Sequence, residues 1–194
     1  MAVPLPPPAT LPDAFGRAVA GLARASVRPE VILTEAPTPT RLAPFAVALD
    51  AEVRGDDDTP LAEGRLVVLH DPAGQDVWQG TTRCVAYAKA PLEADMGLDP
   101  MLPAVGWSWL TDALALTGAT FLAAGGTVTR VTSERFGALA EHPDVSEVEV
   151  RASWSPVGDD LGPHLCAFAE LLCTAAGLPP TPAGVTAIPV RRRR

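Results

Sequence analysis

His70 and Asp71 are the residues in this chain best suited to acid–base chemistry, and they are adjacent at the predicted end of a strand. Histidine suits proton transfer because its unperturbed pKa lies close to neutral pH. The sequence pairs no nucleophile with them, and Asp71 also opens a turn sequence, Asp71-Pro72-Ala73-Gly74, in which the aspartate bonds to its own backbone. A structural turn is therefore the preferred interpretation, and a small enzyme that uses His70 and Asp71 is the alternative.

The other titratable residues show no spacing typical of a metal or cofactor site. His142 and His164 lie in separate predicted elements, and the three histidines form no ligand motif. The acidic stretches at 56–58 and 93–99 lack the spaced ligand loop of a calcium site. The glycines at 125–126 lack the lysine and hydroxyl residue of a phosphate loop. We therefore expect no metal and no cofactor.

Two tryptophans are the candidate binding surface. Trp107 and Trp109 are two residues apart on one predicted helix, which places them about 200° apart around its axis. If Trp109 enters the core, Trp107 projects toward the flank of the helix, where it is either packed under the preceding loop or exposed. An exposed Trp107 near Trp78 would form an apolar patch, and aromatic anchors dominate the binding energy of interfaces. We predict a partner-binding or self-association surface at Trp78 and Trp107.

Charge and cysteine content restrict the environment and the partners. The net charge is −8, and without the four arginines at 191–194 the remainder carries 11 basic against 23 acidic residues, or −12. Such a body repels phosphate backbones, so nucleic acid is an unlikely ligand of the folded part and a protein or peptide fits better. Three cysteines, Cys84, Cys166 and Cys173, cannot form a closed disulfide framework, and we expect buried free thiols.

The N-terminus lacks the features of a secretory signal, and no apolar run approaches the ~20 residues of a membrane span. We therefore expect a cytoplasmic protein that does not enter a membrane. Proline-rich tails at 1–11 and 180–194 flank one predicted domain at 12–179, and we expect the tails to be disordered.

The periodicity of the domain predicts three helices and a run of strands. Apolar residues recur at helical spacing in 13–25, 103–116 and 161–176. Strands are expected at 31–34, 45–54, 65–70, 82–90, 127–131 and 147–154, with turns at 55–60 and 71–74 and a loop at 91–103. Because strands come in runs, this order predicts an α+β fold with a mainly antiparallel sheet, α-β(3-4)-α-β-β-α.

Several strings in this chain resemble an actinobacterial family described only as a domain of unknown function, number three thousand. They are RLAP (41–44), GRLVVLHDPAG (64–74), VGWSWL (105–110), GTVTRV (126–131), the segment 148–154, and ELLCTAAGLP (170–179). The resemblance covers about 13–189, and it implies an actinobacterial, uncharacterised protein with no activity, cofactor or catalytic residue to transfer.

The order of elements is also similar to that of type III secretion chaperone-like domains, which are small acidic proteins that bind extended segments of partners, often as homodimers. This likeness concerns element order alone, and fold does not fix function. The preferred interpretation is a non-enzymatic binding protein, chaperone-like or adaptor-like, that holds a polypeptide along its sheet or its tryptophan-bearing helix. A homodimer is compatible with it.

Overall fold

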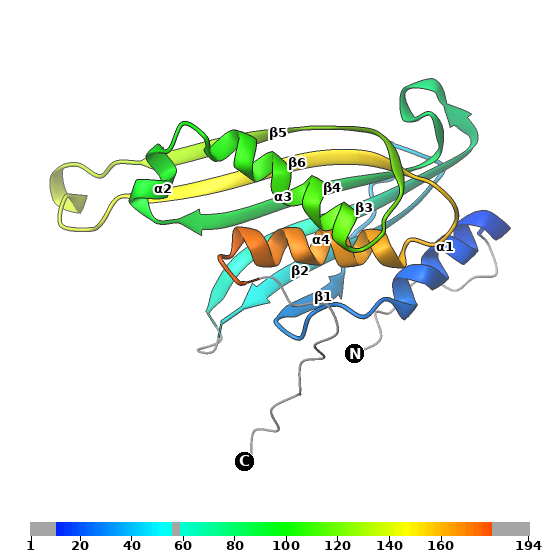
Figure 1. The fold of residues 1–194 in the computed structure, drawn as a ribbon, viewed down its shortest axis with the longest axis horizontal. Coiled ribbons are helices and arrows are strands. Elements are labelled where there is room, and N and C mark those ends of the chain that lie inside the picture. Colours follow the sequence, from blue (N-terminus) through cyan, green and yellow to red (C-terminus); the bar gives the residue numbers. More distant parts are fainter. Residues whose placement is uncertain (1–10, 56–58, 180–194) are drawn as a thin grey trace, which may run out of the picture.

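The computed structural model describes residues 11–55 and 59–179. The predicted tails outside these ranges, at 1–10 and 180–194, and the acidic residues 56–58 lie outside the described residues. The elements follow in the order α1 (Asp13–Arg24), β1 (Val31–Glu35), β2 (Phe45–Arg54), β3 (Pro60–Gln75), η2 (Asp76–Trp78), β4 (Gly80–Leu92), α2 (Ala94–Leu98), α3 (Leu102–Leu116), β5 (Phe121–Ser133), η3 (Gly137–Leu139), β6 (Val145–Pro156) and α4 (Gly162–Ala175) (Figure 1).

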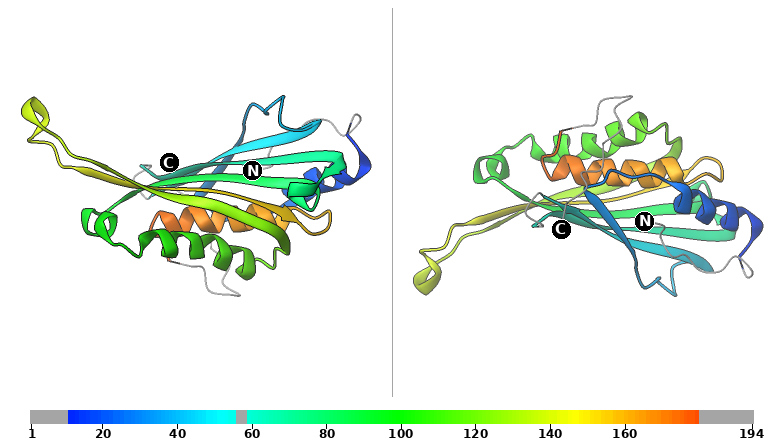
Figure 2. Two further views of the ribbon diagram at one scale, coloured as in Figure 1. Left: turned by 90° about the horizontal axis from the view of Figure 1, so that it is seen from above. Right: turned by 90° about the horizontal axis from the view of Figure 1, so that it is seen from below.

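The strands form one six-stranded antiparallel sheet in the order β1-β2-β3-β4-β6-β5. This confirms the predicted α+β class. The two-residue period of β6 places Val148, Val150, Ala152 and Trp154 in the core, because alternate side chains point to opposite faces. The β5–β6 hairpin extends well beyond the rest of the sheet as an arm that carries η3 at its tip (Figure 2).

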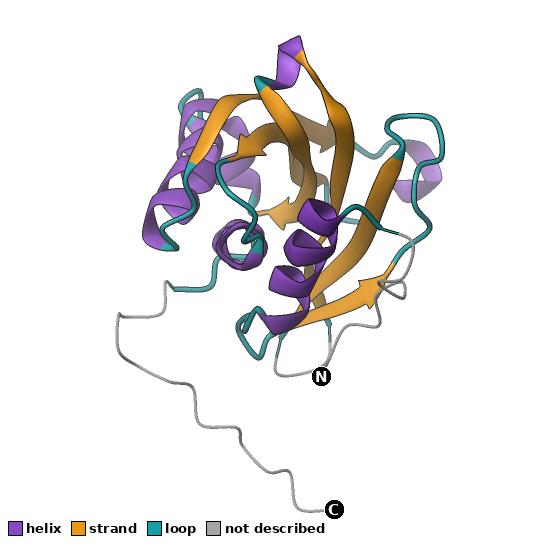
Figure 3. Cartoon of the chain, turned by 90° about the vertical axis from the view of Figure 1, so that its right-hand side faces the viewer, coloured by secondary structure: helices purple, strands orange, loops and turns teal. Residues whose placement is uncertain are grey.

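The helices cover one face of the sheet, which curls around them (Figure 3). Helix α4 lies in the middle, and ten of its residues are buried against the sheet, α1 and α3. Close approach of α4 requires Gly64 of β3, where a Cβ atom would lie 2.9 Å from Leu172 and 3.1 Å from the ring of Phe168. The middle of the opposite face is left without a helical cover.

The structure corrects several boundaries. Strand β3 runs through the predicted turn at 71–74, and the hairpin reverses direction at η2 instead. The turn signal is nevertheless real, since Asp71 Oδ1 accepts a hydrogen bond from the Ala73 N–H at 3.0 Å and the register shifts between His70 and Gln75. The loop expected at 91–103 contains the short helix α2, and β5 is longer at both ends than predicted.

The cysteines are free, with Cys84 and Cys173 buried as expected and Cys166 only partly buried. Among the described residues, we find no helix that is both long enough and apolar enough to cross a membrane.

Candidate functional site

The structure separates the two predicted acid–base residues. His70 is 3% exposed and its ring stacks on Phe15 with centroids 5.1 Å apart, while its Nδ1 lies 3.0 Å from Thr82 Oγ1. Burial lowers the pKa of His70 and thus favours the neutral ring. The Asp71 carboxylate bonds instead to its own turn, at Ala73 and Gln75. Neighbouring residues of a strand point to opposite faces, so His70 and Asp71 form no common site.

His164 is a second core histidine. It lies in the first turn of α4, is buried, and its Nδ1 accepts a hydrogen bond from the indole N–H of Trp154 at 3.0 Å. The proton of the neutral ring therefore belongs to Nε2. Burial lowers the pKa of His164 to about 4. Within residues 11–55 and 59–179, no group of three or more histidine, cysteine or acidic residues is arranged to hold a metal ion.

The two predicted binding tryptophans lie in different elements, Trp78 in η2 and Trp107 in α3. Trp107 is half-buried on the helix-covered side, where its ring packs over Gly126. Trp78 is 8% exposed, and its carbonyl accepts a hydrogen bond from Ser155, which follows Trp154 and so points to the opposite face. The surface at Trp78 and Trp107 stays a prediction; Trp107 packs against the core cluster and Trp78 is largely buried.

The strongest candidate site is the free edge of β5. In the described part of the chain, β5 has a neighbouring strand on one side only, and none of its 13 residues is buried. Edge strands expose unpaired N–H and C=O groups and are usually blunted by proline, charge or short length. Strand β5 contains no proline and a single charged residue, Arg130. Its last nine residues, 125–133, pair with β6 without irregularity.

The other edge of the sheet is protected in the ways that β5 is not. Strand β1 has only five residues and ends at the acidic Glu35. Prolines at positions 37 and 39 follow it closely, and proline cannot donate a backbone hydrogen bond to a further strand. The contrast within one sheet singles out β5 as the edge able to accept an additional strand.

A shallow hollow of about 480 Å³ lies on the open face directly beside this edge. It crosses four neighbouring strands, β3, β4, β6 and β5, and is lined by Arg65, Val67, Val85, Ala86, Tyr87, Gly125, Gly126, Thr127, Arg151, Ala152 and Ser153. Gly125, at which a Cβ atom would meet nothing within 4 Å, leaves its β5 side without side-chain bulk. An extended peptide paired to β5 would place alternate side chains toward this face, because the period of a strand is two.

Tyr87 and Arg151 form the polar floor of the hollow. The Arg151 guanidinium lies 4.9 Å from the centre of the Tyr87 ring and bonds to Glu149 at 3.0 Å. That hydrogen bond lowers the pKa of Glu149, while burial and the negative charge of Glu149 raise the pKa of Tyr87. Near neutral pH the floor therefore presents a cation, a carboxylate and a neutral phenol side by side.

Arg83 fixes the end of the hollow where β5 becomes irregular. Its guanidinium donates to the Ala123 carbonyl at 2.8 Å and to Ser153 Oγ at 2.7 Å. Ala123 has φ 49°, a left-handed conformation, in the register shift between Leu122 and Gly125. Arg83 thus ties β4 to β6 and to the bulge of β5, which holds the edge in place without a covering element.

A second hollow, of about 740 Å³, lies on the same face toward β1. Asp50 and Arg65 form a two-point ion pair across it, at 2.6 and 3.0 Å, and Glu52 and Glu63 flank them. The pair is half exposed, and charged residues of this kind are what a solvated face of an antiparallel sheet carries. Arg65 and Tyr87 line both hollows, which together form one trough across the open face.

The sequence interpretation missed this site, although two signals were present. Residues 147, 149, 151 and 153 alternate with the apolar residues of their strand, and Gly125-Gly126 carries no side chains. What was missing was the strand order. Only the insertion of β6 between β4 and β5 brings Tyr87, Arg151 and Gly126 together.

Comparison with known proteins identifies the family and nothing further. No curated protein and no solved structure matches the chain. A family model described as "Protein of unknown function (DUF3000)" matches residues 11–186, which confirms the resemblance carried by the sequence strings. The match extends from α1 to beyond α4, and this chain therefore belongs to the DUF3000 family of proteins of unknown function.

Proposed function

We propose that this protein is a non-enzymatic, cytoplasmic, protein- or peptide-binding module of chaperone-like or adaptor type that pairs an extended segment of its partner with the free edge of β5. The observation that carries the proposal is the unprotected edge itself, nine regular residues long and neutral apart from Arg130. Addition of a strand to an exposed edge is a general mode of peptide recognition, in which the backbone supplies affinity and pockets supply specificity.

The hollow beside β5 supplies such a pocket. Val67 and Val85 offer an apolar wall, and Arg151 with Glu149 offers hydrogen-bonding groups of both signs. The polar groups are already satisfied within the protein, so an incoming side chain meets a preformed surface and little reorganisation is needed. The three free thiols fit a reducing compartment such as the cytoplasm.

The test combines peptide selection with hydrogen exchange. Twelve-residue peptides displayed on phage are selected against the full chain, and amide exchange of the protein is then measured with and without a selected peptide. We expect protection to appear in β5, at about every second amide of 125–133, because successive N–H groups point to opposite edges of a strand. Protection confined to α3 or to the tails would contradict the proposal.

Proline substitutions supply a matched control. In Val128→Pro and Thr129→Pro, one of the two positions directs its N–H toward β6 and the other toward the free edge. The variant whose unfolding midpoint is unchanged is the one in which the lost N–H pointed toward the free edge. That variant should bind the selected peptides at least tenfold more weakly. The same substitution on the opposite edge, Thr34→Pro, should leave binding unchanged. Equal binding by both β5 variants would refute pairing at this edge.

The alternative, a small enzyme that uses His70 and Asp71, has less support. Proton transfer requires a group within hydrogen-bond reach of a substrate, whereas His70 is stacked under Phe15 and bonded to Thr82. Neither residue lines either hollow of the open face.

A homodimer would also fit the free edge of β5, since a second copy of β5 is itself an extended segment.

A further inference from the structure

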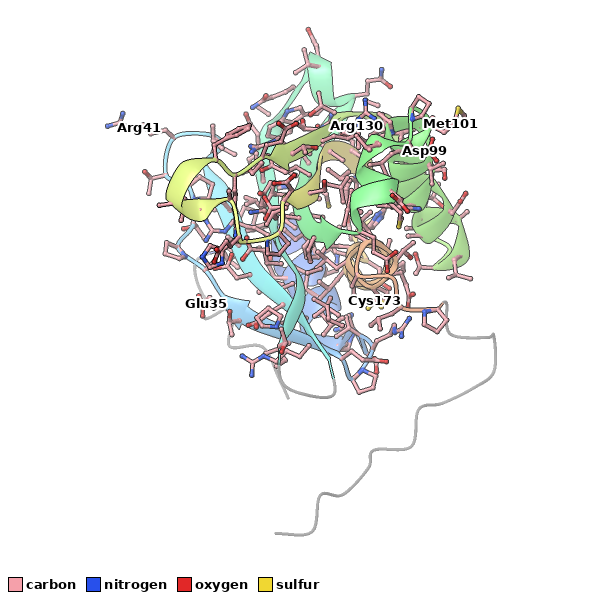
Figure 4. The ribbon with its side chains drawn as sticks, turned by 90° about the vertical axis from the view of Figure 1, so that its left-hand side faces the viewer. Glu35, Arg41, Asp99, Met101, Arg130 and Cys173 are labelled. Carbon is pink, nitrogen blue, oxygen red and sulfur yellow. The ribbon has the colours of Figure 1, made fainter. Side chains whose placement is uncertain are left out.

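A second exposed surface lies where α2 meets the start of α3. Four apolar side chains within ten residues are exposed there, including Leu98 at 73% and Met101 at 59%, and together Met96, Leu98, Met101 and Val105 define the α2–α3 corner. Met101 and Val105 are four residues apart, so they lie on one side of α3, while Leu102, Gly106 and Leu110 face the core. Figure 4 shows Met101 at the margin of the molecule, with its side chain directed away from the body.

The charge around the corner is mainly negative. Glu93, Asp95 and Asp99 are exposed beside the apolar side chains, and residues 90–129 contain no lysine or arginine. Fifteen basic residues in 194 would place about three in a stretch of this length. The basic residues that flank this stretch are Lys89, which pairs with Glu147 at 2.9 Å, and Arg130, whose guanidinium bonds to the Asp99 carbonyl at 2.9 Å (Figure 4). With Arg130 counted, the corner still carries an excess of negative charge.

Isolated exposed apolar residues are normal on a protein surface, but a cluster rimmed by polar groups marks an interaction site. Two of the four side chains are methionines, which are flexible and adapt to varied partners. Helix-binding surfaces of this composition receive apolar anchors at positions i, i+3 or i+4, and i+7 of the incoming helix. Carboxylates at the rim select lysine and arginine on its polar face. An anionic membrane is excluded as the occupant, since its lipids would be repelled by the same carboxylates.

We propose that the α2–α3 corner docks a cationic amphipathic helix of a protein partner. This surface is distinct from the β5 edge, and the proposal does not depend on strand pairing there. Helix α2 contacts β5 and β6, and Gly97 packs so closely on Ser146 that a Cβ atom would lie 2.6 Å from its hydroxyl oxygen. The corner is therefore held against the sheet, and its apolar residues are presented on a fixed backbone.

The test uses a fluorescent 15-residue peptide of leucine and lysine with the leucines at helical spacing. A peptide of the same composition in scrambled order is the control, and both are titrated with the full chain by fluorescence anisotropy. We expect the ordered peptide to bind at least tenfold more tightly than the scrambled one. Leu98→Ser with Met101→Ser should remove that preference. Val77→Ser with Leu42→Ser, which are equally exposed elsewhere, should keep it.

The electrostatic part has its own matched pair of variants. Glu93→Gln with Asp95→Asn and Asp99→Asn removes three charges, and the amide oxygen introduced at position 99 would still accept the hydrogen bond that Asp99 accepts from the Met101 N–H. This variant should bind more weakly and lose much of its dependence on salt. Glu35→Gln with Asp76→Asn and Asp13→Asn removes three charges elsewhere and should change affinity less than twofold.

Four results would overturn the proposal. The ordered and scrambled peptides could bind alike, or corner and control variants could weaken binding equally. Sedimentation could show a dimer that Leu98→Ser with Met101→Ser dissociates, in which case the occupant is a second copy. Replacement of the arginines at 191–194 by glutamine could strengthen peptide binding, in which case the occupant is the chain's own tail.

Discussion

Protonation of the buried His164 should destabilise the fold in mildly acidic solution. The pKa of this imidazole falls from an ordinary 6.5 to about 4 because the ring is buried against Trp154. A base whose pKa is lowered on folding stabilises the native state above its unfolded pKa, and that contribution disappears as the pH falls from about 6.5 toward 4. At about 1.4 kcal/mol for each tenfold change, the full loss is about 3 kcal/mol, of which about 2 kcal/mol is lost by pH 5.

The assay is urea unfolding at pH 7, 6 and 5, followed by tryptophan fluorescence, for the native chain and for His164→Asn. Asparagine retains an acceptor near the Nδ1 position but does not titrate. The variant starts from a lower stability at pH 7 because it fills less of the core. Between pH 7 and pH 5 the native chain should lose about 2 kcal/mol more than the variant does.

His70 contributes in the same direction, since burial also lowers its pKa, but it is present in both proteins and cancels in the difference. His142 is exposed, and His142→Asn is the matched control for the substitution itself. If the unfolding free energies of the native chain and His164→Asn fall in parallel from pH 7 to pH 5, the reasoning is refuted, because His164 then titrates as it does in the unfolded chain.

Three further predictions concern the β5 side of the sheet. Gly126→Ala should lower the unfolding free energy by about 2 kcal/mol, because its Cβ atom would meet the Arg151 carbonyl and the Trp107 ring, whereas Gly125→Ala, which faces open space, should change it little. Ala123→Gly should raise the midpoint of thermal unfolding and increase the unfolding free energy by about 1 kcal/mol. Position 123 has a left-handed backbone conformation, which glycine adopts without the strain that alanine carries. Trp107→Ala should lower the unfolding free energy by about 2 kcal/mol, because the ring loses its packing on Gly126 and the core. Sedimentation of the same variant measures whether association also weakens. Weaker association with an unchanged unfolding free energy would place the ring in an interface.

The parts of the fold that could be predicted are those whose two faces differ. In β2 and β6 every second residue is apolar, so the period alone identified both the strand and its buried side. The sequence predicts too short a β3, because Asp71-Pro72-Ala73-Gly74 favours a turn locally. In the structure, pairing of Gln75 with Gly80 extends the strand beyond this turn. Helix α2 was missed because five residues with an internal glycine show no helical period, and its position is set by packing of Gly97 on Ser146.

The candidate site could not be predicted for a different reason. Its residues come from four strands, and periodicity assigns a residue to a face but does not order the strands within the sheet. A sheet with β5 next to β4 would separate Tyr87 from Arg151 and would leave β6 at the edge. Local sequence indicated only that this edge can form a strand, since 127–132 consists of threonine, valine and one arginine and carries no proline.

Folding and the proposed surface recognition should be separable in this protein, because the sheet has one apolar and one polar face. The side chains of α4, Phe168 and Leu172 among them, pack on the inner face, and the trough on the outer face carries the ion pairs Arg65–Asp50 and Arg151–Glu149. Exposed ion pairs such as Arg65–Asp50 contribute less than about 1 kcal/mol each, so their replacement leaves the fold intact. A change in binding caused by substitutions at Tyr87, Arg151 or the corner residue Leu98 therefore measures recognition itself. Substitutions at Trp154 or His164 act through the core and would alter both properties together.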